Sequence, residues 1–152
     1  MSLVKVKEYF KEYGIDDEII ELDGISATVI EASQALGVDS NQIAKTLAFM
    51  LDKPILIVMS GDVKIDNHKY KDYFGKKAKM IPQDDLDNLI GHKIGGVCPF
   101  AIKDGVKVYL DESLKANHYV YPACGSENSA IKLSIEQLEK YSSYTEWVNV
   151  TK

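Results

Sequence analysis

Cysteine is scarce in this sequence, and its two cysteines do not form a pair motif. Cys98 and Cys124 lie far apart, and the three histidines show neither HxxxH nor HExxH spacing (His68, His92 and His118). Structural zinc sites use closely spaced ligands, and disulfides are rare in a reducing cytosol. We therefore expect neither a zinc site nor a disulfide, and no motif in the sequence predicts another cofactor.

Long apolar runs are also missing. The most apolar stretch, PILIVM at residues 54–59, has the length of a strand and is far shorter than the roughly 20 residues that span a bilayer. The first residues, MSLVKVKEYF, do not show the basic-then-apolar layout of a signal peptide. We therefore expect a cytoplasmic protein that has no membrane as a partner.

An excess of positive charge is absent, because the formal net charge is −5. Broad binding to nucleic acid needs many Lys and Arg contacts to phosphates, so DNA is not an expected partner. Contact with one end of an RNA remains compatible with this charge. The sequence does contain a local basic cluster, which we interpret as solvated faces of a helix and of the strand after it: Lys64, Lys69, Lys71, Lys76, Lys77 and Lys79.

The loops that cradle phosphates in nucleotide-binding enzymes are missing as well. The segment GHKIGG at residues 91–96 fits neither GxGxxG nor GxxxxGK[ST]. The sequence also contains no GxSxG elbow for a serine nucleophile. A nucleotide hydrolase or a serine hydrolase of that type is therefore not expected.

What the sequence does contain is a steady alternation of helix and strand patterns over its 152 residues. Three helical turns begin with a capping pair spaced three residues apart (Thr28 with Glu31, Asp39 with Gln42, Ser134 with Gln137). The runs KTLAFML and ILIVMS, joined by DKP, predict two paired strands, and AKMI and KIGGV predict two more. We expect one compact α/β domain over residues 1–152, with a mixed, mainly antiparallel curved sheet and surrounding helices.

Lys45 is a candidate functional residue, because it enters the apolar strand TLAFML directly after a capped turn. An unpaired buried ammonium is costly, so this amine must either reach water or meet a partner. One interpretation is a fixed cation for a phosphate or a polarised carbonyl. The other is a lysine at the sheet edge whose amine extends to solvent.

The segment GGVCPF at residues 95–100 combines two glycines and a proline with a cysteine. Glycine permits close backbone approach and proline fixes a bend, so Gly95, Gly96 and Pro99 predict either a rigid pocket wall or a simple turn. Cys98 is either a nucleophile, which needs a nearby base such as His92, or a small buried apolar residue.

A second polar loop follows later in the chain, in the segment PACGSENS. Gly125 and Ser126 in this loop are typical of a hairpin turn between two strands. The sharper alternative is that they form a second wall of the same pocket as the GGVCPF loop.

These segments, in this order, resemble the YbaK/EbsC family of aminoacyl-tRNA deacylases, which is related to the editing domain of bacterial prolyl-tRNA synthetases. The resemblance runs from about Thr28 to Leu138. It is carried by the lysine strand IAKTL, by the Gly-x-x-x-Pro loop from Gly95 to Pro99, and by VYPACGSENSAIKL. It implies a mixed α/β fold and a pocket for the aminoacylated 3′ end of tRNA.

The resemblance also implies a reaction, the hydrolysis of the ester between an amino acid and the terminal ribose. Lys45, Gly95 and Gly96 are then the expected catalytic residues. The expected substrate-binding residues are Val97, Cys98, Pro99, Gly125 and Ser126. The substrate is a small amino acid mischarged on tRNA, with proline tRNA as the carrier that the family implies and alanine, cysteine and serine all open. An aminoacyl-tRNA synthetase is a second expected partner.

Two departures from the family pattern affect the loop itself. Ala101 stands where many relatives have glycine, and Cys98 replaces a frequent serine. The exchange at Cys98 argues against an obligatory hydroxyl nucleophile there, which favours hydrolysis without a covalent intermediate. Two alternatives stay open: a non-catalytic module that binds an aminoacyl group or an RNA end, and a thiol-dependent hydrolase of small esters that uses Cys98.

Overall fold

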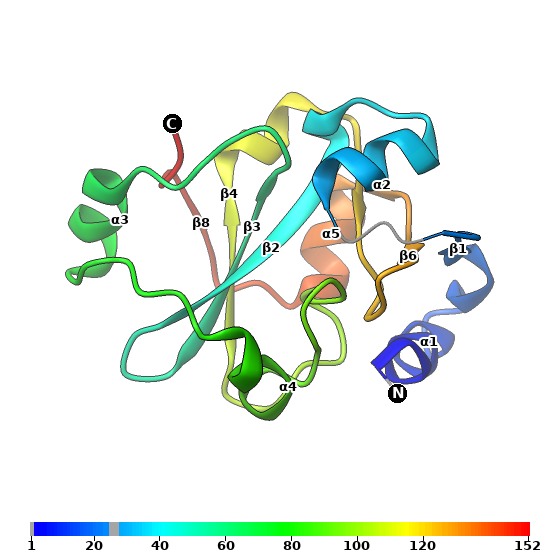
Figure 1. Cartoon of the computed structure of the whole chain (residues 1–152), viewed down its shortest axis with the longest axis horizontal. Helices are drawn as coiled ribbons and strands as arrows, with labels where there is room; N and C mark the ends of the chain where they lie inside the picture. Colours follow the sequence, from blue (N-terminus) through cyan, green and yellow to red (C-terminus); the bar gives the residue numbers. More distant parts are fainter. Residues whose placement is uncertain (1, 25–27) are drawn as a thin grey trace.

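A six-stranded mixed sheet in the order β7-β5-β2-β3-β4-β8 organises the fold, and β1 and β6 form a separate two-stranded ribbon. A computed structural model describes residues 2–24 and 28–152 of the chain (Figure 1). The α-helices are α1 (Ser2–Lys11), α2 (Val29–Leu36), α3 (Asn67–Phe74), α4 (Leu86–Leu89) and α5 (Ile135–Ser142). The strands are β1 (Ile20–Glu21), β2 (Ile43–Met50), β3 (Pro54–Ser60), β4 (Lys107–Asp111), β5 (Tyr119–Pro122), β6 (Ser129–Ala130), β7 (Leu133–Ser134) and β8 (Glu146–Val148).

The predicted capping pairs begin the elements that they were expected to begin. Thr28 and Glu31 form a complete capping box at the start of α2, and Ser134 and Gln137 form one at the start of α5. Asp39 and Gln42 pair in the same way before a short 3₁₀ turn, which leads directly into β2. These side chains satisfy backbone donors that the first turn of a helix leaves open.

The predicted hairpin of β2 and β3 is the longest strand pairing, and it is antiparallel from Ala44↔Ser60 to Met50↔Pro54. β1–β6 and β5–β7 are also antiparallel, whereas β2–β5, β3–β4 and β4–β8 are parallel. The sheet is therefore mixed, as predicted, although parallel pairs form a larger share than the sequence indicated. The added parallel pairs come from crossovers, which local patterns do not reveal.

Two of the predicted strands are reduced or absent. Residues 93–97, predicted as the strand KIGGV, form a turn in which the Gly96 amide donates to the Lys93 carbonyl over 3.0 Å. The AKMI segment makes only a single antiparallel bridge, between Met80 and Phe49. The prediction of a strand over 93–97 was wrong because Gly95 adopts a positive φ of 87°, which breaks an extended chain.

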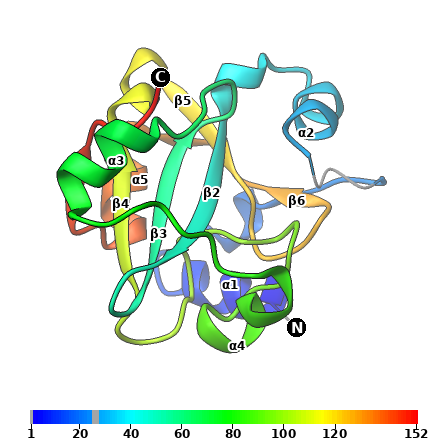
Figure 2. The ribbon, with the colours of Figure 1, turned by 60° about the vertical axis from the view of Figure 1, so that its left-hand side comes forward.

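The two faces of the sheet carry separate hydrophobic clusters. On one face, Tyr70 of α3 packs with Phe49, Ile57 and neighbouring residues. On the other face, Phe10 of α1 and Leu138 of α5 pack against strand residues that include Leu56. Figure 1 shows α3 and α5 on opposite sides of the strands, and in Figure 2 α3 lies in front with α5 partly hidden behind β4. Among the described residues, no helix is long and apolar enough to cross a membrane.

Candidate active site: a cavity beside strand β2

A cavity of about 380 Å³ lies between α2, β2, residues 80–86 and the 94–97 loop. Most of its wall is apolar and comes from residues that are distant in sequence: Val29, Ala32, Leu36, Ile43, Ile81, Leu86, Ile94, Val97 and Ala130. The polar lining side chains are few: Thr28, Lys45, Thr46, Gln83, Tyr121 and Ser129. An apolar cavity with a few convergent polar groups is the usual form of a small-molecule site.

The residue pattern of β2 explains why a cavity exists at this place. Small side chains alternate along the strand at Ala44, Thr46 and Ala48, and Ala44 and Ala48 belong to the cluster that faces α1 and α5. Larger residues between them, Leu47 and Phe49, pack on the opposite face with α3. Because side chains alternate between the two faces of a strand, one face of β2 is lined with small groups and leaves room beside them.

The pairing of β2 leaves the same region open along its edge. β5 pairs with β2 only at Ile43 and Ala44. At the other end, the Ile81 amide donates to the Ala48 carbonyl over 3.0 Å, and the Met50 amide donates to the Lys79 carbonyl over 2.9 Å. Within the described chain, no strand therefore lies opposite Thr46 on this side.

Lys45 lies in the cavity wall, but its amine already has protein partners. Its Nζ donates to the Gly61 carbonyl over 3.2 Å and to the Val63 carbonyl over 2.5 Å. Burial lowers the pKa of Lys45, while the nearby Asp62 carboxylate acts in the opposite direction. An ammonium group has three donors, and these two bonds use two of them.

The Gly95–Pro99 loop reaches the cavity through Gly95 and Val97. Gly96 lies behind them, and its amide donates a hydrogen bond to the Lys93 carbonyl. A Cβ atom at Gly96 would lie 2.5 Å from the Gly125 carbonyl carbon and 2.7 Å from the Ser126 nitrogen. Only glycine fits this contact, so Gly96 sets the position of the loop rather than its chemistry.

The two predicted pocket loops therefore touch one another. A Cβ atom at Gly95 would lie 2.7 Å from Cγ of Glu127, which places the Glu127 stem against the loop. The Ser126 hydroxyl donates to the Asn128 Oδ1 over 2.9 Å and lies 2.7 Å from the Ser129 hydroxyl oxygen. Gly125 and Ser126 support the 95–97 loop from behind, and the cavity wall next to them is formed by Ser129 and Ala130.

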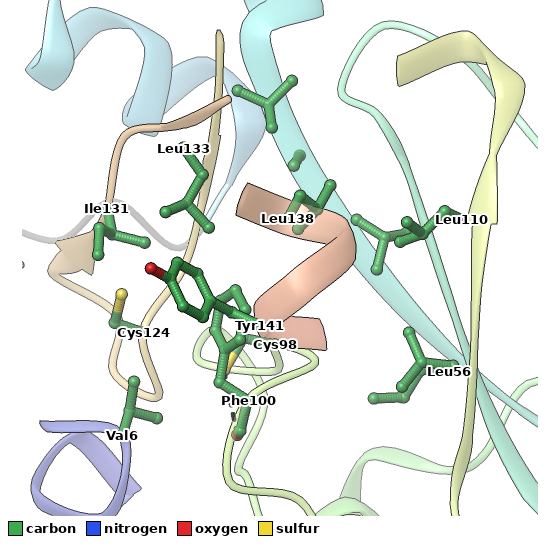
Figure 3. Packing of buried hydrophobic residues seen from close by; sticks show 14 of the residues in the cluster. Val6, Leu56, Cys98, Phe100, Leu110, Cys124, Ile131, Leu133, Leu138 and Tyr141 are labelled. Atoms are coloured by element: carbon green, nitrogen blue, oxygen red, sulfur yellow. Dashed lines mark hydrogen bonds between the residues drawn. The ribbon is translucent and has the colours of Figure 1, made fainter. Parts of the chain in front are cut away.

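Cys98 lies in the hydrophobic core and not in the cavity wall. It is fully buried among residues such as Phe100 (Figure 3), and burial raises the pKa of its thiol to about 12. His92 Nε2 lies 3.5 Å from the sulfur but 2.7 Å from the Phe100 carbonyl, so this nitrogen carries a proton for the carbonyl. This geometry opposes the interpretation of Cys98 as a nucleophile.

Pro99 faces away from the cavity. It lines a second hollow on the other side of the loop, together with Ala101 and Ser142. The structure thus brings Lys45, Gly95 and Val97 together around the cavity, with Gly96, Gly125 and Ser126 supporting them. Cys98 and Pro99 stand apart from that wall.

Several lining residues were not predicted from the sequence. Thr46, Gln83, Met80 and Ile94 line the cavity but were not among the predicted site residues. Thr46 alone carried a detectable sign, a polar residue inside the apolar run TLAFML. Met80 and Ile94 are 56% and 49% exposed, so their apolar side chains stand at the mouth of the cavity.

A lysine directly precedes each of these two residues at the mouth of the cavity. Lys79 precedes Met80, Lys93 precedes Ile94, and both lysines are exposed. The mouth therefore combines apolar surface with positive charge, although the chain as a whole is acidic. This combination suits a single-stranded nucleic acid end, whose bases stack and whose phosphates are anionic.

Fold and cavity together define the class to which the chain belongs. It is a member of the aminoacyl-tRNA editing domain family, whose model matches residues 26–141. The match covers β2 with Lys45, the 95–99 loop and the 125–129 loop, which are the segments that build the cavity and its support.

Particular relatives place the chain more narrowly. It is 44% identical to the uncharacterized protein YwhH of Bacillus subtilis (strain 168), over the whole chain and 98% of that protein. It is 27% identical to the proline–tRNA ligase of Limosilactobacillus fermentum, over 58% of the chain but only 17% of the ligase. A crystal structure described as a "putative trans-editing enzyme for prolyl tRNA synthetase" has a TM-score of 0.89 and 25% identity, covering 99% of this chain and 97% of that one.

Proposed function

We propose that the chain is a freestanding hydrolase that removes a wrong, small amino acid from tRNA. The observation that carries this proposal is the apolar cavity on which the Lys45 strand and the Gly95 loop converge. Membership of the editing-domain family supports an aminoacyl ester as the substrate class. The similarity to part of a proline–tRNA ligase supports proline tRNA as the carrier and that synthetase as a partner.

The proposed reaction is direct hydrolysis of the ester. A water, assisted by a group on the substrate where one is in reach, attacks the ester carbonyl carbon and gives up a proton, and the carbonyl oxygen becomes an oxyanion. The bond from this carbon to the ribose oxygen then breaks, and the ribose oxygen takes a proton. The products are the free amino acid and a tRNA with a free terminal hydroxyl. An aminoacyl ester is already reactive, so positioning and oxyanion stabilisation suffice as the protein's contribution.

The backbone of the 95–97 loop is the proposed oxyanion site. The Gly96 amide is occupied by the Lys93 carbonyl, which leaves the Gly95 and Val97 amides as the donors in the cavity wall. Preorganised backbone donors of this kind typically contribute about 2.7–4 kcal/mol each to the transition state. We assign Gly96 a positioning role, because its contact with Gly125 and Ser126 holds the loop in place.

The 3′ end of the tRNA is proposed to approach over the mouth. Lys45 donates its remaining N–H to a phosphate or carbonyl oxygen of the substrate. Met80 and Ile94 offer apolar surface to a base, and base stacking on such platforms is tolerant of sequence. The amino acid side chain enters the apolar cavity beyond them.

The role that we propose for the cavity is that of a second sieve for small side chains. A synthetase separates side chains that differ by one methylene by only about 1–3 kcal/mol, so small wrong amino acids are charged at an appreciable rate. A separate hydrolase that admits only small side chains corrects this error. Alanine, serine and cysteine are the candidate amino acids.

The decisive experiment is a deacylation panel with alanyl-, seryl-, cysteinyl- and prolyl-tRNA(Pro). We expect at least one of the first three to be hydrolysed well above its spontaneous rate and prolyl-tRNA to be spared. Binding of a non-hydrolysable aminoacyl-adenosine without turnover of any charged tRNA would instead establish a binding module.

A lysine variant tests the assignment of Lys45 in the same assay. Lys45→Met removes the ammonium and keeps the aliphatic stem, and we expect kcat/KM to fall at least tenfold. The matched control is Lys53→Met, which changes an exposed lysine in the turn between β2 and β3. Equal rates for the wild type and Lys45→Met would remove Lys45 from the site.

A further inference from the structure

Thr46 is the one cavity-lining residue whose buried side-chain hydroxyl has no hydrogen-bond partner in the described part of the chain. Leaving a buried hydroxyl without a partner costs stability, because the group has lost its hydrogen bonds to water. The residue as a whole is only partly buried, so a rotation about χ1 exchanges its hydroxyl with its methyl group at the cavity wall. A polar group kept at such a cost suggests that a ligand supplies the partner.

The backbone N–H and C=O groups of Thr46 point toward the open edge of β2. Along an extended strand, the N–H and C=O groups of alternate residues point to the same side. The Ala48 carbonyl and the Met50 amide both bond to the 79–81 segment, and Ala44 pairs with β5. The Thr46 N–H and C=O therefore point into the gap between β5 and the 79–81 segment, where the cavity lies.

The residues that line the cavity provide no carboxylate to bind an amine, and the Glu127 side chain lies against Gly95 outside this lining. Among the described residues that line the cavity, none is Asp or Glu. An aminoacyl ester carries an α-ammonium group next to its carbonyl carbon, and this group needs hydrogen-bond acceptors once it leaves water. The acceptors that the wall offers at the open edge are the carbonyl and hydroxyl oxygens of Thr46.

We propose that Thr46 is the residue that binds the α-ammonium group of the aminoacyl ester, through its main-chain carbonyl and its side-chain hydroxyl. This inference rests on the proposed function. Thr46 and the 95–97 loop line the same small cavity, so an ammonium held at Thr46 leaves the adjacent ester carbonyl to face the Gly95 and Val97 amides. Thr46 is a substrate-binding residue in this arrangement, and it selects α-amino acyl groups over other esters.

The experiment compares two esters on two Thr46 variants. Alanyl-tRNA and propionyl-tRNA have acyl groups with the same carbon chain and differ only by the α-amino group. Thr46→Val removes the hydroxyl and keeps the branched shape, while Thr46→Ser keeps the hydroxyl as the matched control. Each rate is divided by the spontaneous hydrolysis rate of the same ester, because the ammonium activates the ester by itself.

We expect the wild type to prefer alanyl- over propionyl-tRNA by tenfold or more in corrected kcat/KM. Thr46→Val loses at least fivefold of this preference, mainly through the alanyl ester, and Thr46→Ser keeps it within twofold. An equal loss on both esters, or no change on either, would overturn the role of Thr46 while leaving the hydrolase intact. Failure of the wild type to hydrolyse any charged tRNA would instead overturn the proposed function.

A stability measurement separates binding from folding. Because Val fills the same volume without an unpaired hydroxyl, we expect Thr46→Val to unfold at the same temperature as the wild type or a higher one. A variant that loses the alanyl preference while keeping its stability therefore reports ligand binding. A lowered unfolding temperature accompanied by equal loss on both esters would show that Thr46 serves the fold alone.

Discussion

Ala101 holds a backbone conformation that L-residues rarely adopt, with a φ of 54°. The residue directly follows the 95–100 loop. A left-handed conformation costs a non-glycine residue about 1–2 kcal/mol. This strain is stored next to the loop that we propose as the oxyanion site.

Replacing Ala101 by glycine is expected to relieve this strain. The gain is partly offset, because glycine has more freedom in the unfolded chain, so we expect Ala101→Gly to stabilise the protein by up to about 1 kcal/mol. Chemical denaturation with an unchanged m-value measures this. Ala48→Gly, in a regular strand, is the control and is expected to destabilise; a destabilised Ala101→Gly would contradict the strain.

The buried thiol of Cys98 predicts the direction in which the stability of the protein changes with pH. Burial raises the pKa of its thiol from 9.0 to about 12, so the folded state keeps a proton that the unfolded state releases. The contribution of Cys98 to stability is therefore complete below pH 9 and is lost as the pH rises from 9 to 12. Each pH unit in that window removes about 1.4 kcal/mol.

The Cys98→Ser variant separates the contribution of the thiol to stability from that of other groups with raised pKa values. Burial also raises the pKa values of Tyr9 and Tyr73 to about 12, and these residues act in the same direction. The difference in slope between the wild type and Cys98→Ser, measured by denaturation from pH 8 to 10.5, isolates the thiol. Parallel curves would show that the thiol is not protected by burial, and rapid alkylation of folded protein by iodoacetamide at pH 8 would agree with them.

At the scale of elements, Asp111 at the end of β4 ties the C-terminal segment to the sheet. Its fully buried carboxylate accepts hydrogen bonds from the Ser113 amide over 3.0 Å, the Val150 amide over 2.9 Å and the Thr151 hydroxyl over 2.8 Å. Charged acceptors make stronger hydrogen bonds than neutral ones. The carboxylate therefore joins the residues at the end of β4 to the C-terminal residues Val150 and Thr151.

We expect Asp111→Asn to destabilise the protein by about 2–4 kcal/mol, because one acceptor oxygen becomes a donor that faces other donors. Thermal or urea unfolding measures the loss, and the exposed Asp84→Asn is the control. Deacylation at low temperature is expected to remain near the wild-type rate, since Asp111 does not line the cavity. A loss below about 0.5 kcal/mol, the size of an ordinary surface substitution, would contradict the structural role.

Elements with a strong local pattern were the ones that the sequence predicted well. Thr28 with Glu31 and Ser134 with Gln137 mark helix starts because their hydrogen bonds are local. The segment 93–97 was misread as a strand because its apolar residues resemble one, whereas Gly95 turns the chain. The parallel pair of β3 and β4 could not be foreseen, since it depends on contacts between residues about 50 positions apart.

The residues of the candidate site also differ in how well the sequence predicted them. Lys45 and Gly95 were found by motif, and the structure places both on one cavity. Thr46 was not found, because its significance depends on which neighbouring strand is missing opposite it. Cys98 attracted attention as a reactive residue, and only three-dimensional packing shows that its sulfur lies in the core.

At the scale of the whole molecule, positive charge is carried by lysine alone, because the chain contains no arginine. Lysine binds phosphate as a point charge, without the paired geometry of arginine. With an overall charge of −5, contact with tRNA depends on where the lysines stand. Lys79 and Lys93, beside the apolar mouth residues, are the best placed for the 3′ strand.

We expect Lys79→Ala and Lys93→Ala each to raise KM for charged tRNA several-fold with little change in kcat. The slope of log affinity against log salt should become shallower by about 0.7 for each single-strand phosphate that a variant no longer neutralises. Lys11→Ala, which changes an exposed lysine at the end of α1, is the control. An unaltered salt slope in both mouth variants would place the RNA elsewhere on the surface.

The gap in the sheet beside Thr46 affects how substitutions can change the amino acid that the protein prefers. A vacant strand position presents peptide groups, and no substitution removes a peptide group from its place. The main-chain carbonyl that we propose as one acceptor for the α-ammonium group is therefore kept whatever side chain stands at position 46, while the wall residues of α2 and of the 80–86 segment are free to vary. Substitutions in the cavity wall can therefore change which acyl side chain is accepted, while the Thr46 carbonyl stays available to the α-ammonium group.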